Sequence, residues 1–356
     1  MKIAVYEHFT ATQAHHTSIW IEGDSMLKAV VEDLSRAGYE VHATTSIPPK
    51  KPVDLIFIIA PSAGRTLYNL VKACEDEGLD VMDSPSTAVF LATDKALMAR
   101  NLELHGIRTA KTIVSRLEDG LRNIEQALYT YEKVVVKPAD GDGCAGLSLV
   151  TNLDEAPLAL DILRQCTKLP YFLIQEYVEG LNLSVCLLAL DGDVLPLSIN
   201  MQKVHVKGPR ESSIYIGSMV PYEENEKVLK VAVKTIRSLG DVKGFFGIDV
   251  VLKDDEPYVI EVNPRLTTSY LALREISEEN VLEMLANAYF GRQLLRPIKL
   301  KGRAVIEKLV AEKDMVMSFT DLKLPEGAKL LSSIVGRRYL VKKGETYGLY
   351  VHVVEE

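Results

Sequence analysis

Apolar and polar positions change period along the first 90 residues. Short runs typical of buried strands, such as KIAVYE and VDLIFIIAP, are separated by segments with helical spacing, DSMLKAVVEDLSRAG and GRTLYNLVKACEDEG. Strand and helix signals that alternate in this way predict a small doubly wound α/β unit. Three prolines and two lysines between residues 48 and 52 interrupt it as a loop, since a strand resumes at once.

The pattern after residue 90 is that of α+β structure. A helix is predicted over residues 87–105, and KVVVKPADGDGCAGLSLV is predicted to form a hairpin with a glycine-rich tip. From about residue 298 the segments are short and strand-like. These shifts predict four parts: an α/β domain at 1–90, a small α+β lobe at 91–178, a large α+β lobe at 179–297 and a small β-rich appendage at 298–356.

Composition limits the kind of protein without deciding its function. The 356-residue chain is 47% hydrophobic and 25% charged, and its apolar runs are too short to cross a bilayer. With no secretory signal visible and four scattered cysteines, we expect a cytoplasmic protein with reduced thiols and no membrane partner. A net charge of −8 argues against a nucleic-acid partner. A small-molecule ligand is expected, and a homo-oligomer is left open.

The segment YVIEVNPRLTTS, residues 258–269, carries an acid and an amide on one face of a predicted strand. Paired as a hairpin with GFFGIDVVL, it would place Asp249 opposite Glu261, with Asn263 on the same face and Tyr258, Ile260 and Val262 on the core side. Opposed carboxylates repel unless a cation lies between them, and oxygen ligands without His or Cys suit magnesium. The alternative is a solvated face of an edge hairpin.

Two other segments fit a nucleotide phosphate and a purine, although each is weak alone. In DGDGCAG, residues 140–146, glycines let backbone amides approach phosphate oxygens, and Lys137 precedes them. This loop is neither a P-loop nor a dinucleotide fingerprint. QEYVEG, residues 175–180, runs from a strand into a turn and offers hydrogen bonds to a purine edge.

The order of these segments resembles that of the ATP-grasp superfamily from about residue 1 to 295. The resemblance implies an N-terminal α/β domain and two α+β lobes that clamp ATP with Mg²⁺, or alternatively Mn²⁺, and an acyl-phosphate route to an amide. It implies metal ligands at Asp249, Glu261 and Asn263, and a catalytic arginine at Arg265 beside Lys137. The implied nucleotide contacts are Lys95, Lys137, Asp140, Gly141, Gly143, Gly146, Gln175, Glu176, Tyr177 and Val178. Asn182 stands where many relatives have a ribose-binding Glu, with Glu179 as an alternative.

The substrate is a further expectation. RLTTSYLALRE, with MKIAVYEHFT and SIYIGSMVPYEE, resembles the tyramine–glutamate ligases of methanofuran biosynthesis, which join the γ-carboxylate of L-glutamate to tyramine. The basic cluster with Lys203 and Arg210 suits a carboxylate or phosphates, or forms a solvated face. Thr268 and Ser269 fit the amino acid, or cap a helix. The candidate bases for the amine are Glu7, His8, His15, His16, Glu22, Glu211 and Tyr215.

Three rival hypotheses remain. The first is a related ligase for another amino acid and amine, or an enzyme that carboxylates its substrate. The second is a regulatory protein that binds the nucleotide without turnover, against which the intact lysines, metal-type ligands and Arg265 argue. The third is a dehydrogenase, which the residues after the first strand, HFTATQ, disfavour because they lack a glycine fingerprint.

Overall fold

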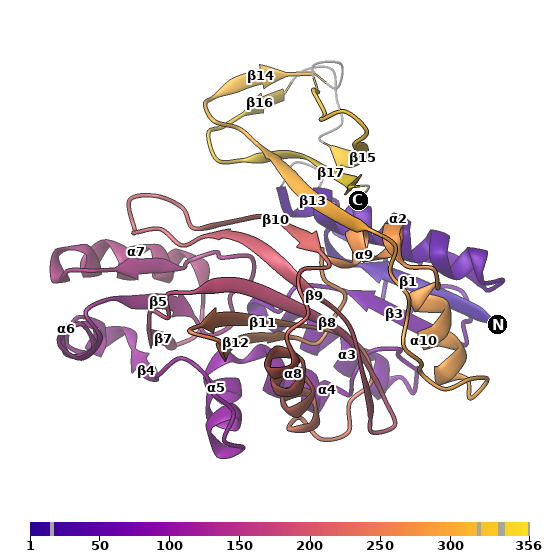
Figure 1. The fold of residues 1–356 in the computed structure, drawn as a ribbon, viewed down its shortest axis with the longest axis horizontal. Coiled ribbons are helices and arrows are strands. Elements are labelled where there is room, and N and C mark those ends of the chain that lie inside the picture. The colour runs from indigo at the N-terminus through magenta and orange to yellow at the C-terminus, as the bar shows by residue number, and fades with distance from the viewer. Residues whose placement is uncertain (15–17, 319–321, 334–338, 355–356) are drawn as a thin grey trace.

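The computed structural model describes residues 1–14, 18–318, 322–333 and 339–354. Three sheets form most of the framework, with helices packed on their faces (Figure 1). The helices of the described chain are α1 (His8–Ala11), α2 (Ser18–Arg36), α3 (Thr66–Asp76), α4 (Ser86–Thr93), α5 (Lys95–Leu104), α6 (Gly120–Tyr131), α7 (Ala156–Cys166), α8 (Glu226–Arg237), α9 (Tyr270–Ile276) and α10 (Val281–Tyr289), with short 3₁₀ turns at Ala63–Arg65, Leu117–Asp119 and Leu153–Glu155.

The strands are β1 (Lys2–Glu7), β2 (Glu40–Thr44), β3 (Leu55–Ile59), β4 (Thr112–Arg116), β5 (Val134–Pro138), β6 (Ser148–Val150), β7 (Tyr171–Glu176), β8 (Leu181–Leu190), β9 (Asp193–His205), β10 (Ile214–Val220), β11 (Gly244–Lys253), β12 (Glu256–Asn263), β13 (Arg303–Val310), β14 (Met315–Met317), β15 (Lys329–Ser333), β16 (Tyr339–Val341) and β17 (Thr346–Val354).

The N-terminal unit is a parallel sheet in the order β2-β1-β3. Ile3 and Val5 of β1 belong to a core shared with α2, whereas Ala4 and Tyr6 belong to a second core shared with α3. Both faces of the sheet are therefore covered, which explains why β1 and β3 are almost continuously apolar and buried. The α/β start predicted from the sequence is confirmed.

The helix predicted over residues 87–105 is two helices, α4 and α5, separated at Asp94. Asp94 leaves the helical conformation and its carboxylate accepts hydrogen bonds from the backbone N–H groups of Ala96 and Leu97, so it caps α5. The break makes Lys95 the first residue of α5 and places its ammonium near residues of β12, as described below.

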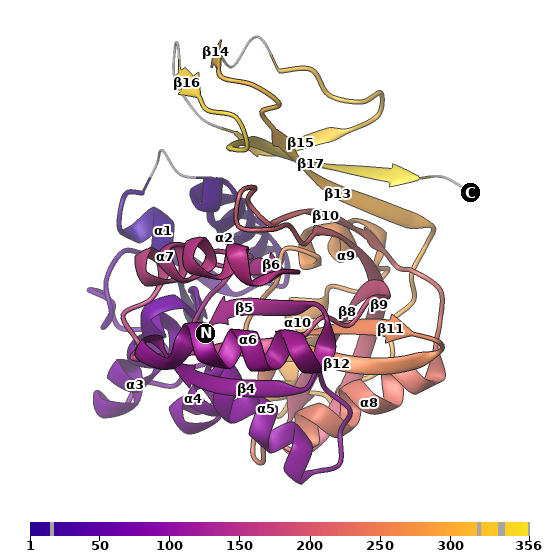
Figure 2. The ribbon, with the colours of Figure 1, turned by 90° about the vertical axis from the view of Figure 1, so that its left-hand side faces the viewer.

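The small lobe is an antiparallel sheet in the order β4-β7-β5-β6, with α6 and α7 on one face (Figures 1 and 2). The apolar sides of these helices, including Ile124 and Leu160, bury Val134, Phe172 and Ile174 of the sheet. The predicted hairpin is present, because β5 pairs with β6 across the glycine-rich segment. The lobe thus carries this loop on a rigid support.

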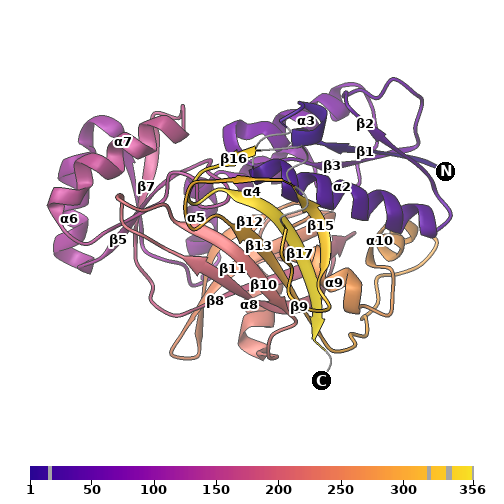
Figure 3. The same ribbon diagram turned by 90° about the horizontal axis from the view of Figure 1, so that it is seen from above.

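The C-terminal segment differs from the expected appendage. β13 pairs with β10, and β17 and β15 follow, so one eight-stranded sheet runs in the order β12-β11-β8-β9-β10-β13-β17-β15. β17 and β15 also contact α2 of the N-terminal unit (Figure 3). The pair β14 and β16 lies away from the body of the molecule (Figures 1 and 2). The large lobe and most of the C-terminal strands are therefore one β structure.

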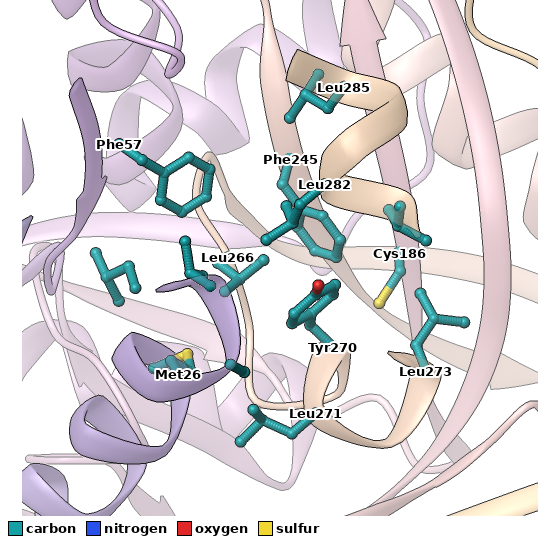
Figure 4. Close-up of a cluster of buried hydrophobic side chains, with 14 of the residues drawn as sticks. Met26, Phe57, Cys186, Phe245, Leu266, Tyr270, Leu271, Leu273, Leu282 and Leu285 are labelled. Atoms are coloured by element: carbon teal, nitrogen blue, oxygen red, sulfur yellow. The ribbon is translucent and has the colours of Figure 1, made fainter. Parts of the chain in front are cut away.

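One hydrophobic core joins the N-terminal unit to the large lobe and the C-terminal strands. Phe57 and Met26 lie in it beside Phe245 and Tyr270 (Figure 4), and Leu349 of β17 belongs to the same cluster. A buried ion pair reinforces it: Arg274 of α9 donates to the Asp33 carboxylate of α2, with its Nε at 2.8 Å from Oδ2, and Tyr270 Oη donates to the same carboxylate. Breaking such a buried pair costs about 3–5 kcal/mol.

The cysteines and the helices indicate whether the chain has disulfides and membrane-spanning segments, respectively. Every cysteine is free, as predicted. None of the helices in the described part of the chain has both the length and the apolar composition that a bilayer crossing requires.

Candidate active site

A single cavity of about 300 Å³ brings the three predicted motifs together. It is lined by the 175–178 strand end, by residues of the glycine-rich loop and the β11–β12 hairpin, and by residues of β1, α1, α2 and β13. All the implied metal ligands, both lysines and Arg265 line this cavity.

Asp249 and Glu261 lie directly opposite each other across the β11–β12 hairpin, as predicted. The route to this pairing is unexpected. The turn is a two-residue one at Asp254 and Asp255, both with positive φ, and its register alone would place Asp249 opposite Ile260. A register shift inserts Ile260 as an extra residue, a β-bulge, and the partner of Asp249 becomes Glu261.

The bulge also changes which side chains of β12 face the core. Val259 and Val262 are buried in the core cluster under the sheet, whereas Tyr258 and Ile260 are only half-buried and Ile260 lines the cavity. The expectation that Tyr258, Ile260 and Val262 face the core is correct for Val262 and wrong for Tyr258 and Ile260. An added residue reverses the alternation of all residues beyond it, so that Ile260 and Glu261 both face the cavity.

The donor set around Asp249 fits a magnesium ion. Its Oδ1 accepts a hydrogen bond from Gln202 Nε2 at 2.9 Å, and Asn263 Nδ2 lies 3.5 Å from Oδ2. Burial and the neighbouring Glu261 carboxylate raise the pKa of Asp249 to about 7. Among the described residues, no three or more His, Cys, Asp or Glu side chains lie together in a group that could hold a metal ion. Two carboxylates and one amide suit Mg²⁺, which keeps several waters and takes further oxygens from phosphates.

Two lysines approach the same region from different elements. Lys95 Nζ lies 2.8 Å from Glu261 Oε1 and donates to the carbonyl oxygen of Gly141 at 2.6 Å. Lys137 of β5 is 4% exposed, and its ammonium has no hydrogen-bond or ion-pair partner among the described residues. Burial, with the positive charge of Lys95, lowers the pKa of Lys137 to about 8. A buried cation without a partner indicates a site for an anion.

The glycine-rich loop is held over the cavity by Asp142. Its Oδ1 accepts from Arg265 Nη2 at 2.7 Å, and its Oδ2 accepts from the backbone N–H of Ser62 in the N-terminal unit. Arg265 Nε is buried without a partner among the described residues. The loop therefore contacts both the N-terminal unit and the segment after β12.

Asp140 and Gly146 flank this loop and do not line the cavity. Asp140 accepts hydrogen bonds from Thr167 Oγ1 at 2.6 Å and from the backbone N–H of Gly64 at 3.2 Å. Gly146 has a φ of +74°, and a Cβ there would meet the Cβ of Cys166 at 2.8 Å. These two predicted nucleotide contacts shape the base of the loop, while Gly141 and Gly143 face the cavity.

The strand end at residues 175–178 offers polar and apolar groups. Gln175, Glu176, Tyr177 and Val178 all line the cavity, as does Asn182. The Glu176 carboxylate accepts a hydrogen bond from the backbone N–H of Lys111 at 2.9 Å. Glu179, the alternative to Asn182, lies outside the lining and forms an exposed ion pair with Lys133.

Comparisons with known proteins agree with this geometry. A model described as the ATP-grasp domain matches residues 92–269, half of the chain. The chain belongs to the ATP-grasp family. The ATP-binding ligase fold expected from the sequence is therefore confirmed, and the matched residues contain Lys95, Lys137, the glycine-rich loop and the β11–β12 hairpin.

Curated relatives of this ATP-grasp chain include the tyramine–L-glutamate ligases of two Methanocaldococcus species. The chain is 29% identical over 253 residues to that of Methanocaldococcus fervens, which covers 70% of each chain. It is 27% identical over 259 residues to that of Methanocaldococcus jannaschii, which covers 72% of this chain and 69% of the relative.

Solved structures share the ATP-grasp architecture. An ATP-grasp superfamily protein from Archaeoglobus fulgidus is 22% identical and superposes with a TM-score of 0.63 over 97% of this chain and 99% of its own. Phosphoribosylamine–glycine ligase from Thermotoga maritima is 17% identical, with a TM-score of 0.70 over 100% of this chain and 93% of its own. Carboxyaminoimidazole ribonucleotide synthase from Aspergillus clavatus, crystallised with ATP, is 14% identical, with a TM-score of 0.73 over 99% and 93%.

The basic cluster expected to bind substrate lies elsewhere in this ATP-grasp chain. Lys203 pairs with Glu307 of β13, and Arg210 is exposed; neither lines the cavity. Lys203 and its neighbour Gln202 point to opposite faces of β9, and only Gln202 faces the cavity. The cluster is a surface feature, as its alternative interpretation allowed.

Lys308 is a cavity residue that the sequence did not reveal. It comes from β13, and its Nζ lies 2.5 Å from Glu22 Oε1 and 5.0 Å from the ring centre of Tyr215. Thr268 donates to the other oxygen of Glu22 at 2.6 Å and also lines the cavity. The sequence around Lys308 did not indicate a cavity residue, because the position of Lys308 depends on the pairing of β13 with β10.

The remaining candidates divide into two groups. Glu7, Glu22, Tyr215 and Ser269 line the cavity, whereas His8 and Glu211 do not. Ser269 is at the start of α9 but makes no capping hydrogen bond with its side chain; its Oγ lies 3.3 Å from Ser218 Oγ. His15 and His16 lie outside the described residues.

Proposed function

We propose that this ATP-grasp chain is an ATP- and magnesium-dependent carboxylate–amine ligase that joins the γ-carboxylate of L-glutamate to tyramine. The observation that carries the chemistry is the convergence, in one cavity, of a carboxylate pair, an unpaired buried lysine and a glycine-rich loop. The likeness to tyramine–L-glutamate ligases over 70% of the chain supports the choice of substrates.

The nucleotide would lie between the two lobes. The strand end at Gln175–Val178 would accept the purine, with Asn182 near the ribose. Lys95, Lys137 and the backbone amides of Gly141 and Gly143 would bind the phosphates, since a compact ammonium and glycine amides are effective partners for phosphate oxygens. Phosphoryl transfer requires charge neutralisation and alignment more than covalent chemistry, and these residue types supply both.

Asp249, Glu261 and Asn263 would hold the magnesium ion. When bound, the ion neutralises charge that develops on the phosphate oxygens during transfer. Arg265 would stabilise the phosphoryl group as it passes to the γ-carboxylate, since its Nε has no partner among the described residues and its Nη2 is held by Asp142. The loop that carries Asp142 would keep water from the acyl phosphate.

The carboxylate substrate would approach the side of Arg265 that faces Thr268 and Lys308. Lys308 is the cation of that end of the cavity, and Thr268 supplies a hydroxyl next to it. Because Lys203 and Arg210 lie outside the cavity, Lys308 replaces them as the proposed partner of the α-carboxylate.

ADP release tests this proposal. Purified protein with ATP and Mg²⁺ should release ADP when glutamate and tyramine are both present, and should form γ-glutamyltyramine detectable by mass spectrometry. A panel of other amino acids, amines and bicarbonate distinguishes a related ligase or a carboxylating enzyme. Turnover that does not depend on tyramine contradicts the substrate assignment. Nucleotide binding without turnover in any combination of these substrates contradicts the proposal that the protein is an enzyme.

A further inference from the structure

Three carboxylates line the cavity apart from those proposed for the metal and the purine wall: Glu7, Glu22 and Asp142. Asp142 is paired with Arg265, and Glu22 is paired with Lys308. Glu7 differs from both, because it has no ion-pair partner among the described residues. It is also the most buried, with 1% of its surface exposed. A buried carboxylate beside a cavity and without a cation is suited to receive one from a ligand.

The Glu7 carboxylate is fixed in place. Its oxygens accept hydrogen bonds from the backbone N–H groups of Phe9 at 3.1 Å and Thr10 at 2.7 Å. Gly23 of α2 lies against it, so closely that a Cβ at that position would be 2.4 Å from Glu7 Oε1. Even an alanine at residue 23 would force the carboxylate to move. The helix therefore leaves room for this acid by means of a glycine.

Apolar side chains line the same cavity as Glu7. They include Phe9, Ile19, Met26 and Ile59, from the elements that carry or adjoin Glu7 and Gly23. A ring or chain with a terminal positive charge fits such a wall, because the apolar part loses contact with water while the charge meets the carboxylate. An amine that lacks an apolar body would leave the wall exposed to water.

Glu7 is connected to the proposed transfer site by a series of contacts. Gly23, which touches Glu7, is adjacent to Glu22, and Glu22 accepts a hydrogen bond from Thr268, three residues after Arg265. Glu7 and Arg265 thus line the same cavity and are linked through Gly23, Glu22 and Thr268.

We infer that Glu7, with the apolar wall of Phe9, Ile19 and Met26, forms the binding site for a primary arylalkylamine, and that its carboxylate takes a proton from the bound ammonium. The inference rests on the proposed function and specifies the amine site within it. Burial raises the pKa of Glu7 above its ordinary value, while the N–H groups of Thr10 and Phe9 act in the opposite direction. A carboxylate with a raised pKa is a better base at neutral pH.

The ammonium R–NH₃⁺ transfers one proton to Glu7 and becomes R–NH₂. The nitrogen lone pair forms a C–N bond with the carbonyl carbon of the acyl phosphate, and the C–O bond to phosphate breaks. The second proton of the nitrogen leaves with the phosphate, which departs as HPO₄²⁻, and Glu7 later returns its proton to water.

Hydroxylamine gives a test that separates the amine step from activation of the carboxylate. It is small and mostly neutral at pH 7.5, so it needs neither the ammonium site nor a base. Full-length protein with ATP, Mg²⁺ and glutamate is given either tyramine or hydroxylamine, and amide and hydroxamate are measured. In Glu7→Gln the ratio of amide to hydroxamate should fall at least about tenfold, since a general base contributes this much or more. The KM for tyramine should rise more than the KM for ATP.

Two controls accompany this variant. Glu155→Gln changes another carboxylate that accepts a backbone N–H, that of Thr151 at 2.9 Å, but lies outside the cavity; it should leave the ratio unchanged. With the wild-type protein, ethylamine should react much more poorly than 2-phenylethylamine at equal concentration.

The outcomes are distinguishable. An unchanged ratio in Glu7→Gln overturns the inference while the proposed function stands. An equal fall in both products assigns Glu7 a structural role only, as cap of α1, and also overturns it. Absence of hydroxamate and amide with the wild-type protein contradicts the proposed function itself.

Discussion

Ile260 is the residue that sets Asp249 opposite Glu261. Without the bulge at Ile260, the turn at Asp254 and Asp255 would pair Asp249 with an isoleucine. The pair then lies on the cavity side, with Lys95 at 2.8 Å from the Glu261 carboxylate. One added residue in a strand thus decides whether this hairpin can hold a divalent cation.

Replacement of Glu261 with Gln should reduce ADP formation more than about 100-fold, because loss of even an outer partner of a metal ligand costs 10–100-fold. The fold should persist, since Gln has the same shape and the repulsion with Asp249 is removed. Steady-state ADP release against Mg²⁺ concentration measures the effect. Glu256→Gln is the matched control on the same strand, exposed at the turn and outside the cavity; activity retained by the Glu261 variant would remove the metal assignment.

Lys137→Met should stabilise the ligand-free protein while abolishing turnover. The pKa of Lys137 is lowered from 10.5 to about 8, so below pH 8 the charged form costs the folded state about 3 kcal/mol, a cost that disappears as pH rises from 8 to 10.5. Methionine removes that cost at neutral pH. Thermal unfolding with and without ATP should show a higher Tm alone and a smaller ATP-induced increase than wild type. A lower Tm without ATP would contradict an uncompensated charge at Lys137.

Lys308→Met and Lys203→Met should have different kinetic effects. Both lysines pair with a glutamate, but only Lys308 lines the cavity. Loss of a charged hydrogen bond to the substrate carboxylate should raise the KM for glutamate about tenfold or more in Lys308→Met, with a smaller effect on ATP. Lys203→Met should leave both KM values near those of wild type. Equal effects of the two variants would return the carboxylate site to the surface cluster.

Asp83 should make the stability of the protein depend on pH. Burial raises the pKa of its carboxyl from 3.8 to about 7, while the N–H of Ile58 and the charge of Lys243 act against this. The folded protein therefore binds more protons than the unfolded chain between those values, and the stabilisation present below pH 4 is lost as pH rises through 7. Asp83→Asn should gain up to about 4 kcal/mol over wild type at pH 8 and little at pH 4.

Urea unfolding at a series of pH values measures this difference. Asn keeps an oxygen for the N–H of Ile58, which lies 2.9 Å from the carboxylate. Asp54→Asn is a useful comparison, because Asp54 accepts the N–H of Lys2 in an exposed position at the same sheet. A difference between wild type and Asp83→Asn that does not change with pH would contradict the raised pKa.

Local patterns were sufficient for the parts of the site that lie close together in the chain. The β11–β12 hairpin and the loop between β5 and β6 follow from alternation and turn residues within short segments. The face of Ile260 could not be predicted, because a bulge leaves no mark in the alternation of YVIEVN.

Contacts between segments that are distant in the chain could not be predicted from the sequence. Lys308 reaches the cavity only because β13 pairs with β10, some 85 residues earlier. Lys203 points away from the cavity because it lies on the opposite face of β9 from Gln202, which lines the cavity. Similarly, Tyr270 and Arg274 carry part of the likeness to the ligases, yet both side chains donate to the Asp33 carboxylate of the N-terminal unit, so they hold the units together.

The position of β17 between β13 and β15 determines when the two ends of the cavity can fold during translation. The segments that carry Lys95, Lys137, Asp249 and Glu261 are all synthesised before β13, which receives its second neighbour only when β17 has been synthesised. The strands and helices of the nucleotide half of the cavity are therefore made first, whereas the end with Lys308 becomes rigid only after β17 has paired with β13. Nascent chains would bind the nucleotide before they could position a carboxylate to consume it.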